Sequence, residues 1–361
     1  MIIFRADGNS SVGLGHVMRC LSIADAFKRA NEKSIFITAD DRLFDTIVSR
    51  GHQSHVLGSL YNQMEEELDA LVDVICRHDV AAIFVDSYYV TERYLKKLKE
   101  LCSQNSIVLI YIDDVLAFPY PCDVLLNYNI YANKKAYKEL YAEADLPEML
   151  INTSYMPIRA EFQNLKDRSL RSKAEDILIS TGGADAECIS VQIIRTIVSH
   201  SEWSNYRFHF IIGMMNENKD SIKSLSNGDD RVILYEQVNN MSELMQKCDV
   251  AISAAGSTLY ELCVTQTPAI TYILEDNQVP GAKGFEDEGV LKCAGDLREL
   301  GVDTLVDKML SEAINLADSY EERLSIAAKM KKIIDGKGAE RIAQEIKRLC
   351  AKHDVLNYRL Y

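Results

Sequence analysis

The stretch "IIFRADGNSSVGLGHVMRCLSIADAFKR" (2–29) decides the fold class of this chain. Its first residues, 2–7, have the apolar composition of a buried strand, and its last part has the apolar spacing of a helix. Between them, glycines mark a tight turn that leads to His16. A strand that enters a helix through such a turn is typical of α/β folds. His16 is therefore either a catalytic group or a structural residue satisfied by its neighbours.

The same alternation of short strands and amphipathic helices runs through both halves of the chain. In the first half the predicted strands are 2–7, 34–39, 81–86, 107–113 and 123–127, with helices that include 62–79 and 91–104. In the second half they are 176–181, 207–213, 231–236, 249–254 and 268–274, with helices at 187–199, 217–225, 241–247 and 257–265. Apolar strands separated by helices predict parallel sheets covered on both faces.

A polar, charged stretch at 164–175 separates these halves and is the predicted linker. We therefore expect an α/β domain over 1–163, a second over 175–300, and a helical tail over 301–361. Two such domains in tandem predict a ligand cleft between them, at the carboxyl ends of the strands.

The composition is that of a soluble globular protein without a large basic surface. Among 361 residues, Lys plus Arg number 40 and Asp plus Glu 54, for a net charge of -14. This balance disfavours nucleic acid or an anionic membrane as a partner. The nine cysteines form no C-x-x-C or zinc-like cluster, so we expect reduced thiols and no metal. With neither a leader-like start nor a membrane-length apolar run, the sequence predicts a cytoplasmic protein.

Three glycine-containing turns follow predicted strands and open predicted helices. They are "GLGH" (13–16), "STGGADAE" (180–187) and "SAAGSTLYEL" (253–262). Each is expected to offer backbone N–H groups and the positive end of a helix dipole, so together they predict a phosphorylated ligand. The alternatives are structural: Gly182 and Gly183 form only a tight turn, and Thr258 with Glu261 forms a capping box.

Two further polar clusters also follow strands. They are "VDSYY" (85–89), with Asp86, Tyr88 and Tyr89, and "IDD" (112–114). Carboxylates at strand ends can bind a metal, but no D-x-D motif of the kind that holds Mg²⁺ and diphosphate occurs. The remaining histidines carry no pattern, and we expect them to be structural or at the surface.

The motifs, taken together, resemble a known family. "FRADGNSSVGLGHVMRC", "DSYY", "IDD", "CDVLLNYNIYA", "YMPIRAEF", "STGGAD", "MSELMQKCDVAISAAGSTLYE" and "EDNQ" occur in family order over about 1–290. They are similar to the UDP-2,4-diacetamido-2,4,6-trideoxy-β-L-altropyranose hydrolases of pseudaminic acid biosynthesis. The second half also resembles the nucleotide-binding half of MurG and other GT-B glycosyltransferases. The resemblance implies a GT-B fold, in which two Rossmann-like domains face each other across a cleft.

The resemblance also implies roles for individual residues. His16 matches the general base, and Tyr88 and Asn277 match residues near the sugar. Glu261 matches the carboxylate that pairs with the ribose, and the backbone from Val238 to Met241 matches the uracil segment. The remaining expected substrate-binding residues are Ser257, Thr258 and Gly183 on the diphosphate side, together with Gly15, Arg19, Gly182, Gln278 and, near the hinge, Arg159. Arg19 and Arg5 are expected to offset the anionic charge of the ligand.

The function implied is hydrolysis of a UDP-linked deoxy amino sugar at the anomeric carbon, with inversion and release of UDP. UDP is a good leaving group, and its growing charge needs only fixed donors, so no metal or cofactor is expected. Histidine suits the role of base at neutral pH. The alternatives are a GT-B glycosyltransferase, a hydrolase of a related UDP-diacetamido sugar, and a non-catalytic nucleotide-sugar-binding protein.

Overall fold

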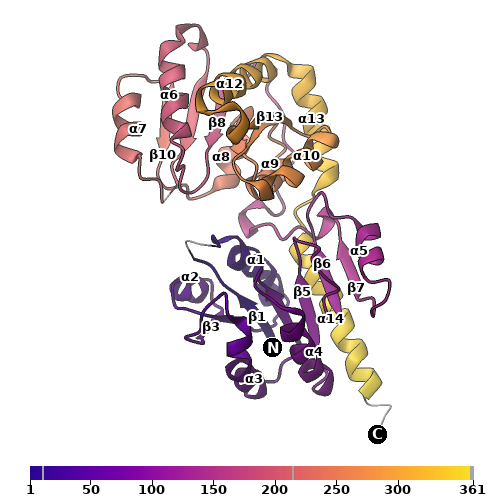
Figure 1. Cartoon of the computed structure of the whole chain (residues 1–361). Helices are drawn as coiled ribbons and strands as arrows, with labels where there is room; N and C mark the ends of the chain where they lie inside the picture. Colours follow the sequence, from indigo (N-terminus) through magenta and orange to yellow (C-terminus); the bar gives the residue numbers. More distant parts are fainter. Residues whose placement is uncertain (10–11, 214, 358–361) are drawn as a thin grey trace. The chain divides into compact units, whose positions relative to one another are not determined.

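The computed structural model describes residues 1–9, 12–213 and 215–357, with side chains as far as 352. The chain divides into two compact units (Figure 1). Unit 1 comprises Met1–Ala160 and Gly336–Tyr361, and unit 2 comprises Glu161–Asp335. No helix in the described ranges is both long enough and apolar enough to cross a membrane.

Unit 1 is built on a seven-stranded parallel sheet with the order β3-β2-β1-β4-β5-β6-β7. The strands are β1 (Ile2–Ala6), β2 (Ser34–Thr38), β3 (Gln53–Val56), β4 (Ala82–Asp86), β5 (Val108–Ile112), β6 (Val124–Asn127) and β7 (Glu148–Ile151). The helices are α1 (Gly15–Arg29), α2 (Phe44–Ser49), α3 (Leu68–Cys76), α4 (Glu92–Gln104), α5 (Lys134–Leu140) and α14 (Gly338–Asn357). The residues of β1, β2, β4, β5 and β6 are all buried, as the apolar runs predict.

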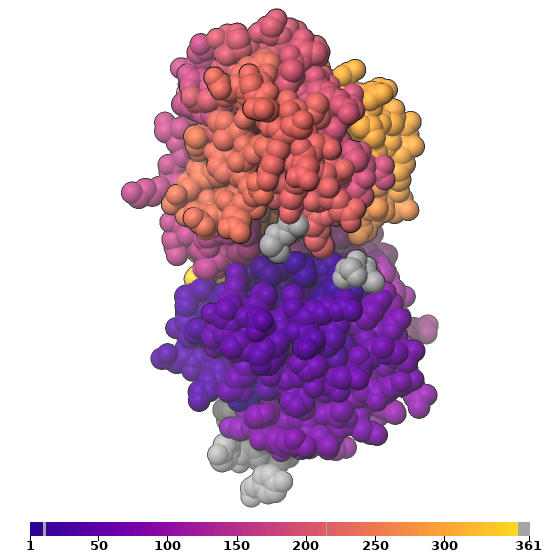
Figure 2. Space-filling view, turned by 90° about the vertical axis from the view of Figure 1, so that its left-hand side faces the viewer, coloured from indigo at the N-terminus to yellow at the C-terminus, as the bar shows by residue number. Residues whose placement is uncertain are grey.

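The central strands of unit 1 are held together by aromatic packing. Phe4 of β1 stacks on Phe36 of β2 and on Phe84 of β4, with ring centroids 5.0 and 4.8 Å apart. This register fixes the carboxyl ends of β1 and β4 side by side, since Ala6 pairs with Asp86. On the side shown in Figure 2, the surface of unit 1 is formed mainly by the first part of the chain, in indigo and purple.

Unit 2 repeats the same architecture with a six-stranded parallel sheet in the order β10-β9-β8-β11-β12-β13. Its strands are β8 (Asp176–Ser180), β9 (Arg207–Ile211), β10 (Val232–Tyr235), β11 (Val250–Ala254), β12 (Ala269–Ile273) and β13 (Lys292–Asp296). Its helices are α6 (Ile189–Ser199), α7 (Lys219–Ser226), α8 (Met241–Lys247), α9 (Thr258–Val264), α10 (Val279–Asp287), α11 (Leu297–Leu300), α12 (Val302–Asp318) and α13 (Tyr320–Ile333).

Three strands, β3, β7 and β13, are absent from the sequence-based prediction. All three lie at sheet edges, and "QSHV" and "KCAGD" lack the apolar run by which a central strand is recognised. The predicted helix at 62–79 is a 3₁₀ turn over Met64–Glu67 followed by α3, which ends at Cys76.

The structure also divides the chain differently from the expected boundaries. The predicted linker at 164–175 packs on unit 2: Arg168 donates to Thr267 Oγ1 at 2.6 Å, and Arg171 pairs with Asp176 at 2.7 Å. The expected tail, 301–361, is shared between the units. Its helices α12 and α13 belong to unit 2, whereas α14 belongs to unit 1 and lies along α1 and β5 (Figure 1).

Candidate active site

His16 lies at the start of α1 and is paired with a carboxylate at the end of β4. Its side chain is 6% exposed, and Nδ1 lies 2.6 Å from Asp86 Oδ1. Arg19 Nη2 is 3.1 Å from the same nitrogen. A carboxylate oxygen this close to Nδ1 requires a proton between them, so Nδ1 carries the hydrogen and donates it to Asp86. When the ring is neutral, its lone pair is therefore on Nε2, which is the form a general base needs.

Arg19, one helical turn after His16, holds Asp86 from its other side. Its Nε and Nη2 donate to the two Asp86 oxygens, each at 2.5 Å. Burial alone would raise the pKa of Asp86, but Arg19 and His16 hold it well below its usual range. Nη1 of Arg19 donates to Asp114 at 2.7 Å and to Tyr128 at 2.8 Å. Every guanidinium nitrogen of this predicted substrate-binding residue thus has a protein partner.

Tyr88 lies beside His16, and its side chain is about half exposed. The two rings meet edge to face with centroids 4.5 Å apart, and the Tyr88 hydroxyl donates to Asp114 Oδ2 at 3.2 Å. Burial, and after it the charge of Asp114, raises the pKa of Tyr88. The neighbouring Asp113 faces inward and accepts from Tyr120 Oη and the Val115 N–H, both at 2.8 Å. Of the two carboxylates of the "IDD" motif, Asp113 therefore holds the loop, and Asp114 contacts Arg19 and Tyr88 at the site.

Arg5 lies in the interior of unit 1, although it was expected to offset the charge of a ligand. Its guanidinium is fully buried, donates to both Glu67 oxygens at 2.6 and 2.7 Å, and donates to Asp7 at 2.5 Å. These buried partners compensate its charge, so Arg5 supports the interior of unit 1 and does not face a ligand.

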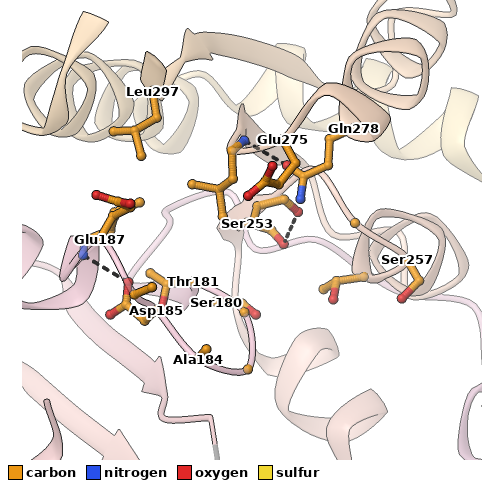
Figure 3. Close-up of a pocket in the computed structure, with 18 of the residues that line it drawn as sticks. Ser180, Thr181, Ala184, Asp185, Glu187, Ser253, Ser257, Glu275, Gln278 and Leu297 are labelled. Atoms are coloured by element: carbon orange, nitrogen blue, oxygen red, sulfur yellow. Dashed lines mark hydrogen bonds between the residues drawn. The ribbon is translucent and has the colours of Figure 1, made fainter. Parts of the chain in front are cut away.

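Unit 2 contains a pocket of about 620 Å³ at the carboxyl ends of β8, β11, β12 and β13 (Figure 3). Five of the predicted residues line it: Gly182, Gly183, Ser257, Thr258 and Gln278. The Gln278 side-chain oxygen accepts the Leu274 N–H at 2.9 Å, which leaves its amide nitrogen as the polar group offered to the pocket. Glu187, Glu275 and Arg298 add charged groups to the walls.

The conformation of the loop after β8 depends on residues with positive φ and on the carboxylate of Asp185. Gly182 has φ +93°, Asp185 φ +49° and Cys188 φ +55°. Asp185 is buried and accepts the N–H groups of Ile189 and Ser190 at 2.9 and 3.1 Å. The expectation that this turn leaves the N-terminus of its helix free is therefore wrong, because Asp185 occupies the first N–H groups of α6.

The capping box at Thr258, the structural alternative for this turn, is not formed. Helix α9 begins at Thr258, so Ser257 is the capping position, and its side chain makes no capping hydrogen bond. Glu261 is half-buried in the first turn of that helix. Its assignment to a ribose remains a prediction.

The remaining predicted residues lie outside the lining of this pocket. Asn277 is exposed in the 3₁₀ turn Asp276–Gln278. Val238 and Met241 precede and begin α8, and the Met241 N–H donates to Glu161 Oε2 at 2.9 Å. In unit 1, Gly15 is the exposed first residue of α1, and Arg159 is half-buried near the end of the first segment of that unit.

Gly213 is a structural residue of this site that the sequence analysis does not single out. It follows β9, and a Cβ atom there would lie 2.1 Å from the carbonyl oxygen of Gly183. The absence of a side chain thus allows the end of β9 to lie against the glycine loop. A glycine two residues after the strand "RFHFI" is the signal that could have indicated it.

Comparison with known proteins shows the fold. Residues 176–346 match the C-terminal domain of glycosyltransferase family 28. MurG of Acinetobacter baumannii superposes with a TM-score of 0.67 at 12% identity, covering 96% of this chain and 99% of MurG. The chain has the GT-B fold, with two α/β units that are each built on a parallel sheet, as the sequence predicts.

The relatives whose names are more specific share little sequence identity with this chain. The spore coat polysaccharide biosynthesis protein SpsG of Bacillus subtilis is 22% identical over 340 residues, 93% of this chain and 95% of SpsG. The UDP-2,4-diacetamido-2,4,6-trideoxy-β-L-altropyranose hydrolase of Campylobacter jejuni is 24% identical over 80% of this chain and 98% of its own length. The chain spans about half of a longer Helicobacter pylori protein, a pseudaminic acid cytidylyltransferase and hydrolase, covering 46% of it at 26% identity.

Proposed function

We propose that the protein hydrolyses a UDP-linked 2,4-diacetamido-2,4,6-trideoxy hexose at the anomeric C–O bond, with inversion, as a step of pseudaminic acid biosynthesis. The observation that carries the proposal is the buried contact of His16 Nδ1 with Asp86, which leaves Nε2 as a base beside Tyr88. The alignment of 80% of this chain with 98% of a hydrolase of that name supports the choice of substrate.

The proposed reaction is a single displacement by water. Nε2 of His16 takes one proton from water, whose oxygen forms a bond to the anomeric carbon as the bond to the UDP oxygen breaks. Asp86 stabilises the imidazolium that results, and Arg19 keeps Asp86 ionised. One attack from the face opposite the leaving group gives inversion. The proton on the imidazolium then returns to solvent.

Unit 2 supplies the proposed nucleotide contacts. Gly182, Gly183, Ser257 and Thr258 hold the diphosphate with fixed backbone and hydroxyl donors, which stabilise the charge that develops on UDP. Glu261 pairs with the ribose diol. The uracil lies along the backbone of 238–241, where the Met241 N–H is already bound to Glu161 and the Asn240 carbonyl already accepts the Leu244 N–H. Asn277 and Gln278 face the sugar.

An acceptor-free assay tests the proposal. Incubation with a panel of UDP-amino sugars should release free UDP from the diacetamido trideoxy sugar in the presence of EDTA. In ¹⁸O-water the label should appear in the sugar and be absent from UDP. Label in phosphate, with UMP and sugar 1-phosphate as products, would place the attack at phosphorus and contradict the mechanism.

The second candidate is a GT-B glycosyltransferase, and the match of 176–346 to the family 28 C-terminal domain favours it. In that case UDP release would be slow in water alone. It would rise on addition of a hydroxyl acceptor, and the sugar would be recovered on that acceptor.

Gly213→Ala is expected to weaken UDP binding by about tenfold or more. The new methyl group would meet the Gly183 carbonyl, and such overpacking costs roughly 1–3 kcal/mol, which the loop can relieve only by moving. Titration calorimetry with UDP measures the loss. Gly281→Ala in α10 is the matched control, because a Cβ there meets nothing within 4 Å. Equal UDP affinity in both variants would show that the loop does not bind the diphosphate.

A further inference from the structure

The hydroxyl proton of Tyr88 is already used within the protein. Asp114 Oδ2 accepts from Tyr88 Oη at 3.2 Å and from Arg19 Nη1 at 2.7 Å. Its other oxygen, Oδ1, accepts from Asn129 Nδ2 at 2.7 Å. A carboxylate with a guanidinium on one oxygen and an amide N–H on the other can only accept. Tyr88 must therefore be the donor, and the lone pairs of its oxygen are what it offers to a ligand.

Tyr88 and His16 border the same hollow. The hollow is lined by both residues, and their rings are in edge contact with centroids 4.5 Å apart. Nε2 of His16 is an acceptor when the ring is neutral, for the reason given above. A small molecule that contacts both groups must bring two hydrogens, and water is the smallest one that does.

We propose that Tyr88 accepts the second hydrogen of the nucleophilic water, and that Asp114 is the positioning residue that imposes this role. The proposal rests on the hydrolysis proposed above. One water proton moves to His16 Nε2, and the other remains on the attacking oxygen, hydrogen-bonded to Tyr88. With both hydrogens directed, a lone pair of the water is aimed at the anomeric carbon.

The opposite role, in which Tyr88 donates its proton to the leaving group, conflicts with its surroundings. It would create a phenolate beside the carboxylates of Asp114 and Asp86, both of which disfavour a negative charge on Tyr88. Burial and these two carboxylates raise the pKa of Tyr88, so the proton is held more tightly than in a free phenol.

A double-mutant cycle on UDP release tests the coupling. Tyr88→Phe and Asp114→Ala should each lower kcat by about tenfold, the effect of one hydrogen bond, with little change in KM. If Asp114 acts through Tyr88, the double variant should be no slower than the slower single variant. Multiplied losses, about a hundredfold in the double variant, would overturn the proposal. Tyr128→Phe is the control, because it removes a partner of Arg19 and none of Tyr88, and its effect should multiply with that of Tyr88→Phe.

A second measurement needs no turnover. With 3-fluorotyrosine at position 88, fluorine NMR gives the phenol pKa, and Asp114→Ala should lower it by removing the acceptor and its charge. An unchanged pKa would overturn the role of Asp114 even in an active enzyme. If the wild type releases no UDP from any sugar but the pKa falls, the hydrolase function and the role of the water fail, while the Asp114–Tyr88 contact stands.

Discussion

His16→Ala should lower kcat for UDP release by roughly 10²–10⁴-fold, the usual contribution of a general base. The affinity for UDP should not change, because the proposed nucleotide contacts belong to unit 2. His16→Asn should lower kcat to a similar extent, because the amide of the new asparagine cannot take a proton at neutral pH. Steady-state kinetics and UDP titration calorimetry provide the two measurements.

The control for this prediction is His78→Asn, at a half-buried histidine of unit 1 that follows α3 and lies outside the hollow beside Tyr88. It should retain wild-type kcat and KM. Full activity in His16→Ala would remove His16 from the mechanism, and its contact with Asp86 would then be structural.

Glu67→Gln should destabilise unit 1 by about 3–5 kcal/mol, the cost of breaking a buried ion pair from one side. Arg5 and Glu67 are both fully buried, and the variant leaves the guanidinium with Asp7 as its charged partner. Glu65→Gln, at a more exposed carboxylate 3.6 Å from Arg93, should change stability by no more than about 1 kcal/mol.

Urea unfolding can assign that loss to one unit. The single tryptophan, Trp203, lies in unit 2, so its fluorescence reports the unfolding of that unit. Circular dichroism reports both units. We expect Glu67→Gln to shift the transition seen by circular dichroism and to leave the fluorescence transition in place. A shift in fluorescence alone would contradict the assignment of this ion pair to unit 1.

The fold was predictable because each central parallel strand is marked in the sequence by a run of apolar residues. Strands such as "IIFRA" and "AIFVD" are apolar at every buried position or nearly so, and the sequence places them correctly. Edge strands carry a weaker signal because one side has no neighbouring strand, which is why "QSHV" was not predicted.

The candidate site was predictable only where a motif marks it. His16 and the Gly182–Gly183 loop lie in recognisable turns. The partner of His16, however, is 70 residues away, and only the pairing of β1 with β4 brings Asp86 to it. Gly213 and Asp185 both fix the conformation of the loop after β8. Such contacts depend on the register of neighbouring strands, which residue spacing does not reveal.

The return of α14 to unit 1 determines the order in which the chain can be completed during synthesis. Ile342 and Ile346 of this helix are fully buried, and Arg341 donates to the Ser154 carbonyl at 2.6 Å. Unit 2, a continuous segment, leaves the ribosome whole while unit 1 still lacks its last helix. The unit that begins first is therefore completed after unit 2, because the surface that α14 covers stays open until Gly338–Asn357 has emerged.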